Sequence, residues 1–174
     1  MPRSFDVSVD FENNIDEVFR AFSTEDYWLA RLAESGADDT KLESLRVGGR
    51  SGTERTIEVV TLQVAHRHNL SAMIAPLLRG DLCLRRAETW GPVSDGVATA
   101  SVEASVEGAP AAVSGTALLS PLAKSGGSLL DGTFTVQVRV PLIGGKLEKI
   151  IGAELGGLLV AEQRFTKEWL TNNF

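Results

Sequence analysis

The last thirty residues of the chain, 145–174, constrain its fold most strongly because they read as one long amphipathic helix. At 100° per residue they place an apolar stripe opposite a basic face. The stripe consists of Leu147, Ile151, Leu155, Leu158, Phe165 and Trp169, flanked by Ile150 and Leu159. A helix over 145–171, capped by Gly144, would be about 40 Å long at about 1.5 Å per residue. Such a helix needs a long apolar surface to lie against, and the rest of the chain must supply it.

The composition is that of an ordinary globular protein, and the net charge disfavours two classes of binding partner. A chain of 174 residues with 43% hydrophobic residues is expected to form a single domain, 1–174, with a sizeable core. Its net charge of −6 disfavours binding to nucleic acid and to anionic membranes. No apolar run reaches the roughly 18 residues of a transmembrane helix. Residues 1–14 alternate polar and apolar side chains, so we expect no signal peptide and a cytoplasmic protein.

The N-terminal forty residues predict one strand and two short helices. Apolar and polar residues alternate over 4–11, which indicates a half-buried strand. Asn14 and Glu17 have the spacing of a capping box at the start of the first helix. Thr24 is expected to cap the second helix and Gly36 to stop it. The residues expected to be buried on that second helix are Trp28, Leu29 and Leu32.

The middle of the chain, from about Asp39 to Leu142, is almost entirely strand-like. Six strands are predicted, at 40–48, 53–66, 81–91, 96–107, 111–120 and 129–141. The breaks between them have turn chemistry, as at Gly48-Gly49, Ser94-Asp95-Gly96, Gly108-Ala109-Pro110 and Ser125-Gly126-Gly127. Because most connections are short, antiparallel pairing is favoured over parallel crossovers.

The predicted order is therefore an α+β fold of one strand, two helices, six strands and a long helix. A strongly curved antiparallel sheet would cover its apolar face with the C-terminal helix. The residues expected to face inward on two central strands are small: Ala98, Ala100, Val102, Ala104, Ala111, Val113, Gly115 and Ala117. They either leave a cavity beneath the helix or let the helix approach the sheet closely.

This chain resembles the START-like, or helix-grip, superfamily of lipid-transfer proteins, polyketide cyclases and pollen-allergen-like proteins. Within it, the chain is most similar to an uncharacterised actinobacterial family. The resemblance is carried by PRSFDVSVDF at the start, EDYWLARL at 25–32, and VQVRVPLIGGKLEKIIGAELGGLLVAEQRFTKEWL near the end. It implies a seven-stranded sheet gripping the C-terminal helix and a hydrophobic small molecule as partner. It implies no cofactor and brings no catalytic residues.

The connection at 66–81 is too long for a tight hairpin and unusually apolar. Within it, Met73, Ile74, Leu77 and Leu78 could form a short helix, with Pro76 tolerated in the first turn. The segment 72–79 either closes the end of the core or acts as a lid over a ligand cavity.

Three functions are compatible with these patterns. The first is the binding or transport of a hydrophobic small molecule, such as a lipid or a polyketide-like compound, between sheet and helix. The second is a cyclase, aromatase or hydratase that uses the same cavity, and the third is a protein-interaction module. The sequence does not indicate an oligomeric state. The residues expected to contact a ligand are Ile74, Leu78, Trp90, Val102, Ala104, Val113, Ala117, Phe134, Val136, Val138, Ile151, Leu155, Leu158, Leu159 and Glu162.

Glu162 is the one carboxylate within the apolar stripe of the last helix. A buried carboxylate is costly unless it is paired or becomes neutral. It is expected either to form a salt bridge to a sheet arginine, Arg86 or Arg139, or to lie at the helix edge. The alternative is a polar anchor for a ligand, or a weak candidate for a general acid/base.

The remaining candidates favour structural roles. His66 and His68 could share one face of a strand, but zinc takes three or four protein ligands, so no metal site is expected. Cys83 is expected to pack as a small hydrophobe. Trp90 is either core or cavity wall, and Tyr27 either lines a cavity mouth or packs.

Overall fold

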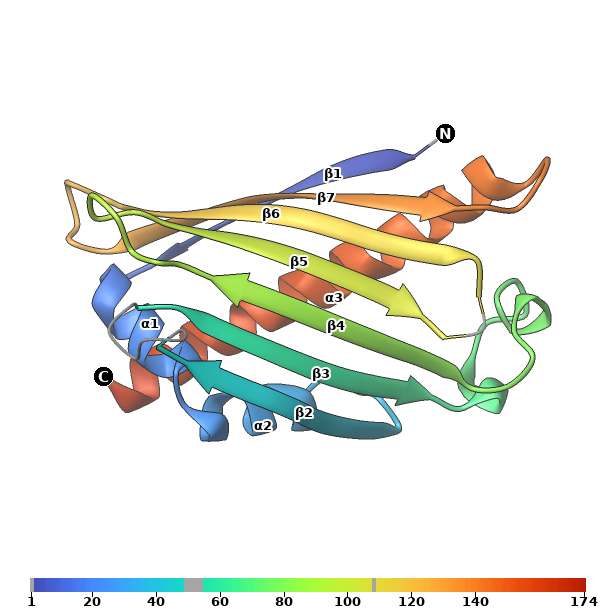
Figure 1. The fold of residues 1–174 in the computed structure, drawn as a ribbon, viewed down its shortest axis with the longest axis horizontal. Coiled ribbons are helices and arrows are strands. Elements are labelled where there is room, and N and C mark those ends of the chain that lie inside the picture. The colour runs from blue at the N-terminus through green and yellow to red at the C-terminus, as the bar shows by residue number, and fades with distance from the viewer. Residues whose placement is uncertain (1, 49–54, 108) are drawn as a thin grey trace.

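A seven-stranded antiparallel sheet curves around one long helix (Figure 1). The computed structural model describes residues 2–48, 55–107 and 109–174. The strands are β1 (Arg3–Phe11), β2 (Asp39–Val47), β3 (Ile57–Ala65), β4 (Leu82–Trp90), β5 (Ala98–Val106), β6 (Ala111–Pro121) and β7 (Ser128–Val138). The helices are α1 (Ile15–Phe22), α2 (Glu25–Ala33) and α3 (Gly144–Asn173), with short 3₁₀ turns at Arg67–Asn69 and Ala75–Leu77.

The strand order is β1-β7-β6-β5-β4-β3-β2. Strands β2 to β7 therefore lie side by side in the order of the chain, and β1 lies next to β7 at the edge of the sheet. It pairs antiparallel with the last strand, for example Phe5 opposite Phe134. The predicted helix-grip fold is thereby confirmed: α+β, one curved antiparallel sheet, two short helices and a long C-terminal helix. All six predicted central strands are present, and their described ends differ from the predicted ends by up to three residues. The turn residues Gly49 and Gly108, and the predicted strand start at 53 and 54, lie outside the described residues.

The start of α1 follows the predicted capping box. The Glu17 backbone N–H donates to Asn14 Oδ1 at 3.0 Å, and the Asn14 backbone N–H donates to Glu17 Oε2 at 3.2 Å. Thr24 is the N-cap of α2, as predicted, but its side chain makes no capping hydrogen bond to that helix. Its hydroxyl donates backward to the Ala21 carbonyl at 2.8 Å, where it extends the end of α1.

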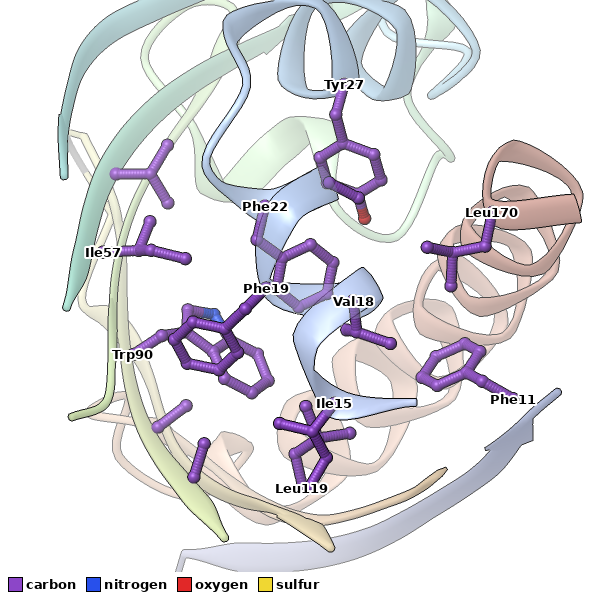
Figure 2. Close-up of a cluster of buried hydrophobic side chains, with 14 of the residues drawn as sticks. Phe11, Ile15, Val18, Phe19, Phe22, Tyr27, Ile57, Trp90, Leu119 and Leu170 are labelled. Atoms are coloured by element: carbon purple, nitrogen blue, oxygen red, sulfur yellow. The ribbon is translucent and has the colours of Figure 1, made fainter. Parts of the chain in front are cut away.

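One end of the sheet holds the main apolar core, which encloses α1 (Figure 2). The rings of Phe22 and Trp90 lie with centroids 5.1 Å apart, and Phe22 also contacts Tyr27 and Trp28. Leu170 brings the C-terminal end of α3 into the same cluster. This end of the molecule is therefore closed by packed side chains. Leu29, which was predicted to be buried, is 46% exposed because it lies on the outer side of α2.

The long helix α3 begins one residue earlier than predicted, and Gly144 is its first residue rather than its cap. A side chain at Gly144 would press against the Val138 carbonyl, which explains the glycine at this close approach. The helix buries a face that is rotated slightly from the predicted stripe. Its buried residues are Gly144, Leu147, Glu148, Gly152, Glu162, Thr166 and Leu170. The stripe residues from Ile151 to Leu159 are only half-buried, and they face the spaces described next.

The other end of the sheet is built from connections rather than from a packed core. The turn after α2, the 66–81 connection and the segment between β7 and α3 all contribute residues to this end. Among the described residues no helix is long and apolar enough to cross a membrane.

Candidate functional site

Two adjoining spaces lie between the concave face of the sheet and α3. The outer pocket, of about 550 Å³, lies at the end built from connections, and exposed Asn69 and Ser71 on its rim open it to solvent. The inner cavity, of about 140 Å³, lies deeper, toward the core around α1. Leu84 of β4 and Leu155 of α3 line both spaces, so the two adjoin at this pair of side chains.

The walls of the outer pocket are mostly apolar. Its volume falls within the roughly 300–1,000 Å³ typical of small-molecule sites. The apolar side chains of its walls include Ile74, Leu78, Leu82, Leu84, Val106, Val138, Val140, Leu147, Ile151, Leu155 and Leu158. The segment 72–79 supplies Ile74 and Leu78 to this wall, and Leu78 is buried whereas Met73 of the same segment is half exposed. An apolar segment that contributes to a pocket wall explains why this connection is so hydrophobic.

The inner cavity combines small apolar residues of the sheet with a group of polar side chains. Val102, Ala104, Val113, Gly115 and Ala117 form its floor on β5 and β6. A space of about 140 Å³ is close to the size that accommodates one benzene-sized molecule. The polar residues on its wall include Tyr27, Arg31, Arg86, Glu88, Glu162, Gln163 and Thr166.

Fourteen of the fifteen residues expected to contact a ligand lie on one of the two spaces. The outer pocket takes Ile74, Leu78, Val138, Ile151 and Leu158, and Leu155 lines both. The inner cavity takes Trp90, Val102, Ala104, Val113, Ala117, Phe134, Leu159 and Glu162. The exception is Val136, which is fully buried in a cluster with Phe134 and Leu147 and lines neither space. Trp90 is both core and wall, because it packs on Phe22 and also reaches the inner cavity.

Four charged side chains, Arg31, Arg86, Glu88 and Glu162, form a buried charge cluster on the inner cavity. None of the four is more than 10% exposed. Arg86 donates to both carboxylate oxygens of Glu162, at 2.7 and 3.2 Å. Arg31, at the end of α2, bridges Glu162 and Glu88 at 3.1 Å to each. The predicted pairing of Glu162 with Arg86 is confirmed, whereas exposed Arg139 takes no part in it.

The cluster is extended by hydrogen bonds to uncharged side chains. The Thr166 hydroxyl donates to the Glu162 carbonyl one turn back, at 2.8 Å. Tyr27 Oη lies 2.8 Å from the same hydroxyl oxygen and therefore donates to it. Trp90 Nε1 donates to Glu88 at 3.4 Å. The network thus joins α2, β4 and α3 across the inner cavity.

Burial is the largest cause of the pKa shifts of Glu162 and Tyr27. Burial raises the pKa of Glu162 to about 7, Arg31 opposes that rise, and Glu88 adds to it. Burial likewise raises the pKa of Tyr27, with Arg31 again opposing the rise. With both glutamates ionised, two guanidinium groups face two carboxylates, and the cluster has no net charge.

The sequence interpretation missed Arg31, Glu88 and Gln63 as pocket residues. Glu88 and Arg86 are two and four residues from Trp90 on one strand, so alternation places all three on the concave face. The same rule places Gln63 on the face of buried Val59. No comparable signal identified Arg31, because its burial depends on partners from β4 and α3.

The two histidines and the cysteine lie away from these spaces. His66 and His68 follow the end of β3 rather than lying in it, and their rings stack with centroids 5.7 Å apart. Asp81 Oδ2 accepts a hydrogen bond from His66 Nδ1 at 3.2 Å, and this bond raises the pKa of that imidazole. Cys83 is half-buried, and burial raises the pKa of its thiol. Among the residues with described placement, no three His, Cys, Asp or Glu side chains group as metal ligands.

A third hollow, of about 750 Å³, lies on the outer face of the sheet. Its walls include the outward side chains of Asp6, Ser8, Thr99, Ser101 and Asp131, all exposed. An exposed polar surface of this kind offers little apolar burial to a ligand, so the two spaces under α3 form the candidate site.

Sequence comparison places the chain in a family. Residues 6–170 match DUF2505, described as a protein of unknown function. The chain belongs to this family. It is 57% identical over 173 residues to uncharacterized proteins of Mycobacterium tuberculosis and Mycobacterium bovis, and the match covers 99% of each chain.

Structural comparison finds the same fold in more distant proteins. A crystal structure from Thermus thermophilus matches with a TM-score of 0.58 at 15% identity, over 98% of both chains. Norcoclaurine synthase from Thalictrum flavum, in complex with dopamine and hydroxybenzaldehyde, matches with a TM-score of 0.54 at 10% identity. That match covers 100% of this chain and 89% of the synthase. At these identities the likeness establishes the fold alone.

Proposed function

We propose that this protein binds a hydrophobic small molecule between the curved sheet and α3. The observation that carries the proposal is the apolar outer pocket of about 550 Å³, which opens to solvent and adjoins the inner cavity at Leu84 and Leu155. Apolar burial at about 25 cal/mol per Å² would supply most of the affinity. The segment 72–79 supplies part of the wall at the entrance, and this position is the one expected for a lid.

The fold supports this proposal because another protein with this fold forms a complex with small molecules. Norcoclaurine synthase was crystallised with two small aromatic molecules on the same fold. We also infer that the DUF2505 family belongs to the START-like superfamily, on the shared element order and the residues at both ends of the chain.

An enzymatic role for Glu162 receives less support from the geometry. A general acid/base must reach a reacting atom, but two guanidinium groups occupy both oxygens of this carboxylate. The raised pKa of Glu162 is the one feature in favour of catalysis. We therefore infer that the charge cluster has a structural role in the wall of the cavity and not a catalytic one.

Uptake of a neutral fluorescent apolar probe, Nile red, tests the proposal, together with native mass spectrometry of the protein from its own host. Leu158→Trp is expected to fill the outer pocket and to weaken probe binding at least tenfold, because Leu158 lines its wall. Val160→Trp is the matched control, since Val160 lies on the same helix and is 61% exposed. Absence of uptake by the unmodified protein, or equal uptake by both variants, would count against binding in this pocket.

A further inference from the structure

The concave sheet surface of the outer pocket contains one buried polar side chain, Gln63 of β3. Gln63 is 7% exposed and lines the outer pocket. Its Oε1 is buried and makes no hydrogen bond. A buried acceptor without a partner costs roughly 1–3 kcal/mol, so a ligand donor in the pocket would satisfy this oxygen once the Gln63 amide turns toward the pocket.

The neighbours of Gln63 across the sheet are apolar. Gln63 lies opposite Leu84 of β4, and Leu84 lies opposite Val106 of β5. On the next two strands, Ala111 lies opposite Val138. All five of these residues line the outer pocket. They form a row across five strands, roughly 19 Å long at about 4.8 Å per strand spacing, with its one polar member at the β3 end.

The charges around the outer pocket disfavour an anionic ligand. Among the described residues that line it, the only charged side chain is Glu154, and none is an arginine, lysine or histidine. The nearest buried arginines, Arg31 and Arg86, are already balanced by Glu88 and Glu162. A carboxylate placed here would lose its hydration without gaining a cation, and that transfer is strongly unfavourable.

We propose that the outer pocket selects an electrically neutral, largely apolar molecule that carries a hydrogen-bond donor, such as a long-chain alcohol, and that Gln63 Oε1 accepts that hydrogen bond. This inference rests on the proposed binding function. The apolar body of the ligand lies along the row from Leu84 to Val138, beneath Ile151, Leu155 and Leu158 of α3.

Competition against bound Nile red with four compounds that share a twelve-carbon chain tests the proposal: 1-dodecanol, its methyl ether, dodecanoate and dodecylammonium. The alcohol donates a hydrogen bond and the ether does not. We expect the alcohol to bind about three- to tenfold more tightly than the ether, the range set by one net hydrogen bond. Dodecanoate is expected to bind at least tenfold more weakly than the alcohol.

Gln63→Leu should abolish the preference for the alcohol over the ether. The matched control is Gln137→Leu, the same substitution at an exposed position on β7, which should preserve the preference. If Gln63→Leu does not fold, Gln63→Met serves in its place, and the ligand series on the unmodified protein remains decisive.

The outcomes separate this inference from the proposed function. Equal binding of alcohol and ether, or a preference that survives at Gln63→Leu, overturns the role of Gln63 and indicates that water satisfies its carbonyl. Tighter binding of dodecanoate or dodecylammonium than of the alcohol overturns selection for a neutral ligand. In both cases apolar binding stands. Failure of all four compounds and of Nile red overturns the proposed function itself.

Discussion

Replacing Glu162 by leucine removes one carboxylate from the buried charge cluster and leaves two arginines facing Glu88. The lost interactions are three hydrogen bonds from guanidinium groups, at 2.7, 3.1 and 3.2 Å. Removing one partner of a buried ion pair lowers the stability of the fold by about 3–5 kcal/mol, because the remaining charge stays buried without compensation. We therefore expect Glu162→Leu to lower the free energy of unfolding by about 3–5 kcal/mol, a large part of the roughly 5–15 kcal/mol of a typical domain.

The double variant Glu162→Leu/Arg86→Leu tests the physical reason for that loss. It restores charge balance and leaves the pair Arg31–Glu88, so we expect it to lose less than the single variant by about 1–3 kcal/mol. Glu58→Leu is the control, because Glu58 pairs with Arg46 at the exposed surface, where a salt bridge contributes about 1 kcal/mol or less.

Urea unfolding followed by far-ultraviolet circular dichroism at pH 8 measures all three variants, since Glu162 is mostly ionised there. The reasoning would be refuted if Glu162→Leu were as mild as Glu58→Leu. It would also be refuted if the double variant lost at least as much stability as Glu162→Leu alone. Either result would mean that the cluster does not depend on charge balance.

Three further predictions concern single positions. Gly156→Ala should raise the melting temperature, because a Cβ there meets nothing within 4 Å and alanine favours helix by about 1 kcal/mol. Gly152→Ala should lower it, because its Cβ would strike the Phe5 ring, and equal shifts at both glycines would contradict that contact. Asn14→Ala should lower stability by about 1 kcal/mol in urea unfolding through loss of the cap on α1, and an unchanged midpoint would contradict the cap's contribution.

The fold was predictable from the sequence because its signals are local and periodic. Alternation over β1, the capping box at Asn14 and the apolar stripe of α3 each depend on neighbouring residues alone. The order of these elements then leaves one sheet face for the helix to cover. The boundaries were less accurate, as at β3 and β7, because strand ends depend on pairing with other strands.

The polar part of the candidate site was only partly predictable. Glu162 stood out because it interrupts an apolar stripe, and Arg86 was named as one of two partners. Arg31 could not be assigned, since nothing in its own helix distinguishes a buried arginine from an exposed one. Gln63 reads as an ordinary polar residue until the unpaired carbonyl oxygen is seen in three dimensions.

The buried charge cluster also governs how α3 is seated along the sheet. Leucine side chains tolerate small displacements of a helix, whereas the paired donors of Arg86 hold both oxygens of Glu162 at fixed positions. The helix is thereby pinned in register near the inner cavity, so the depth available to a ligand is fixed from that side. Any adjustment to ligands of different length must come from the opposite end, where the connection at 66–81 supplies the wall.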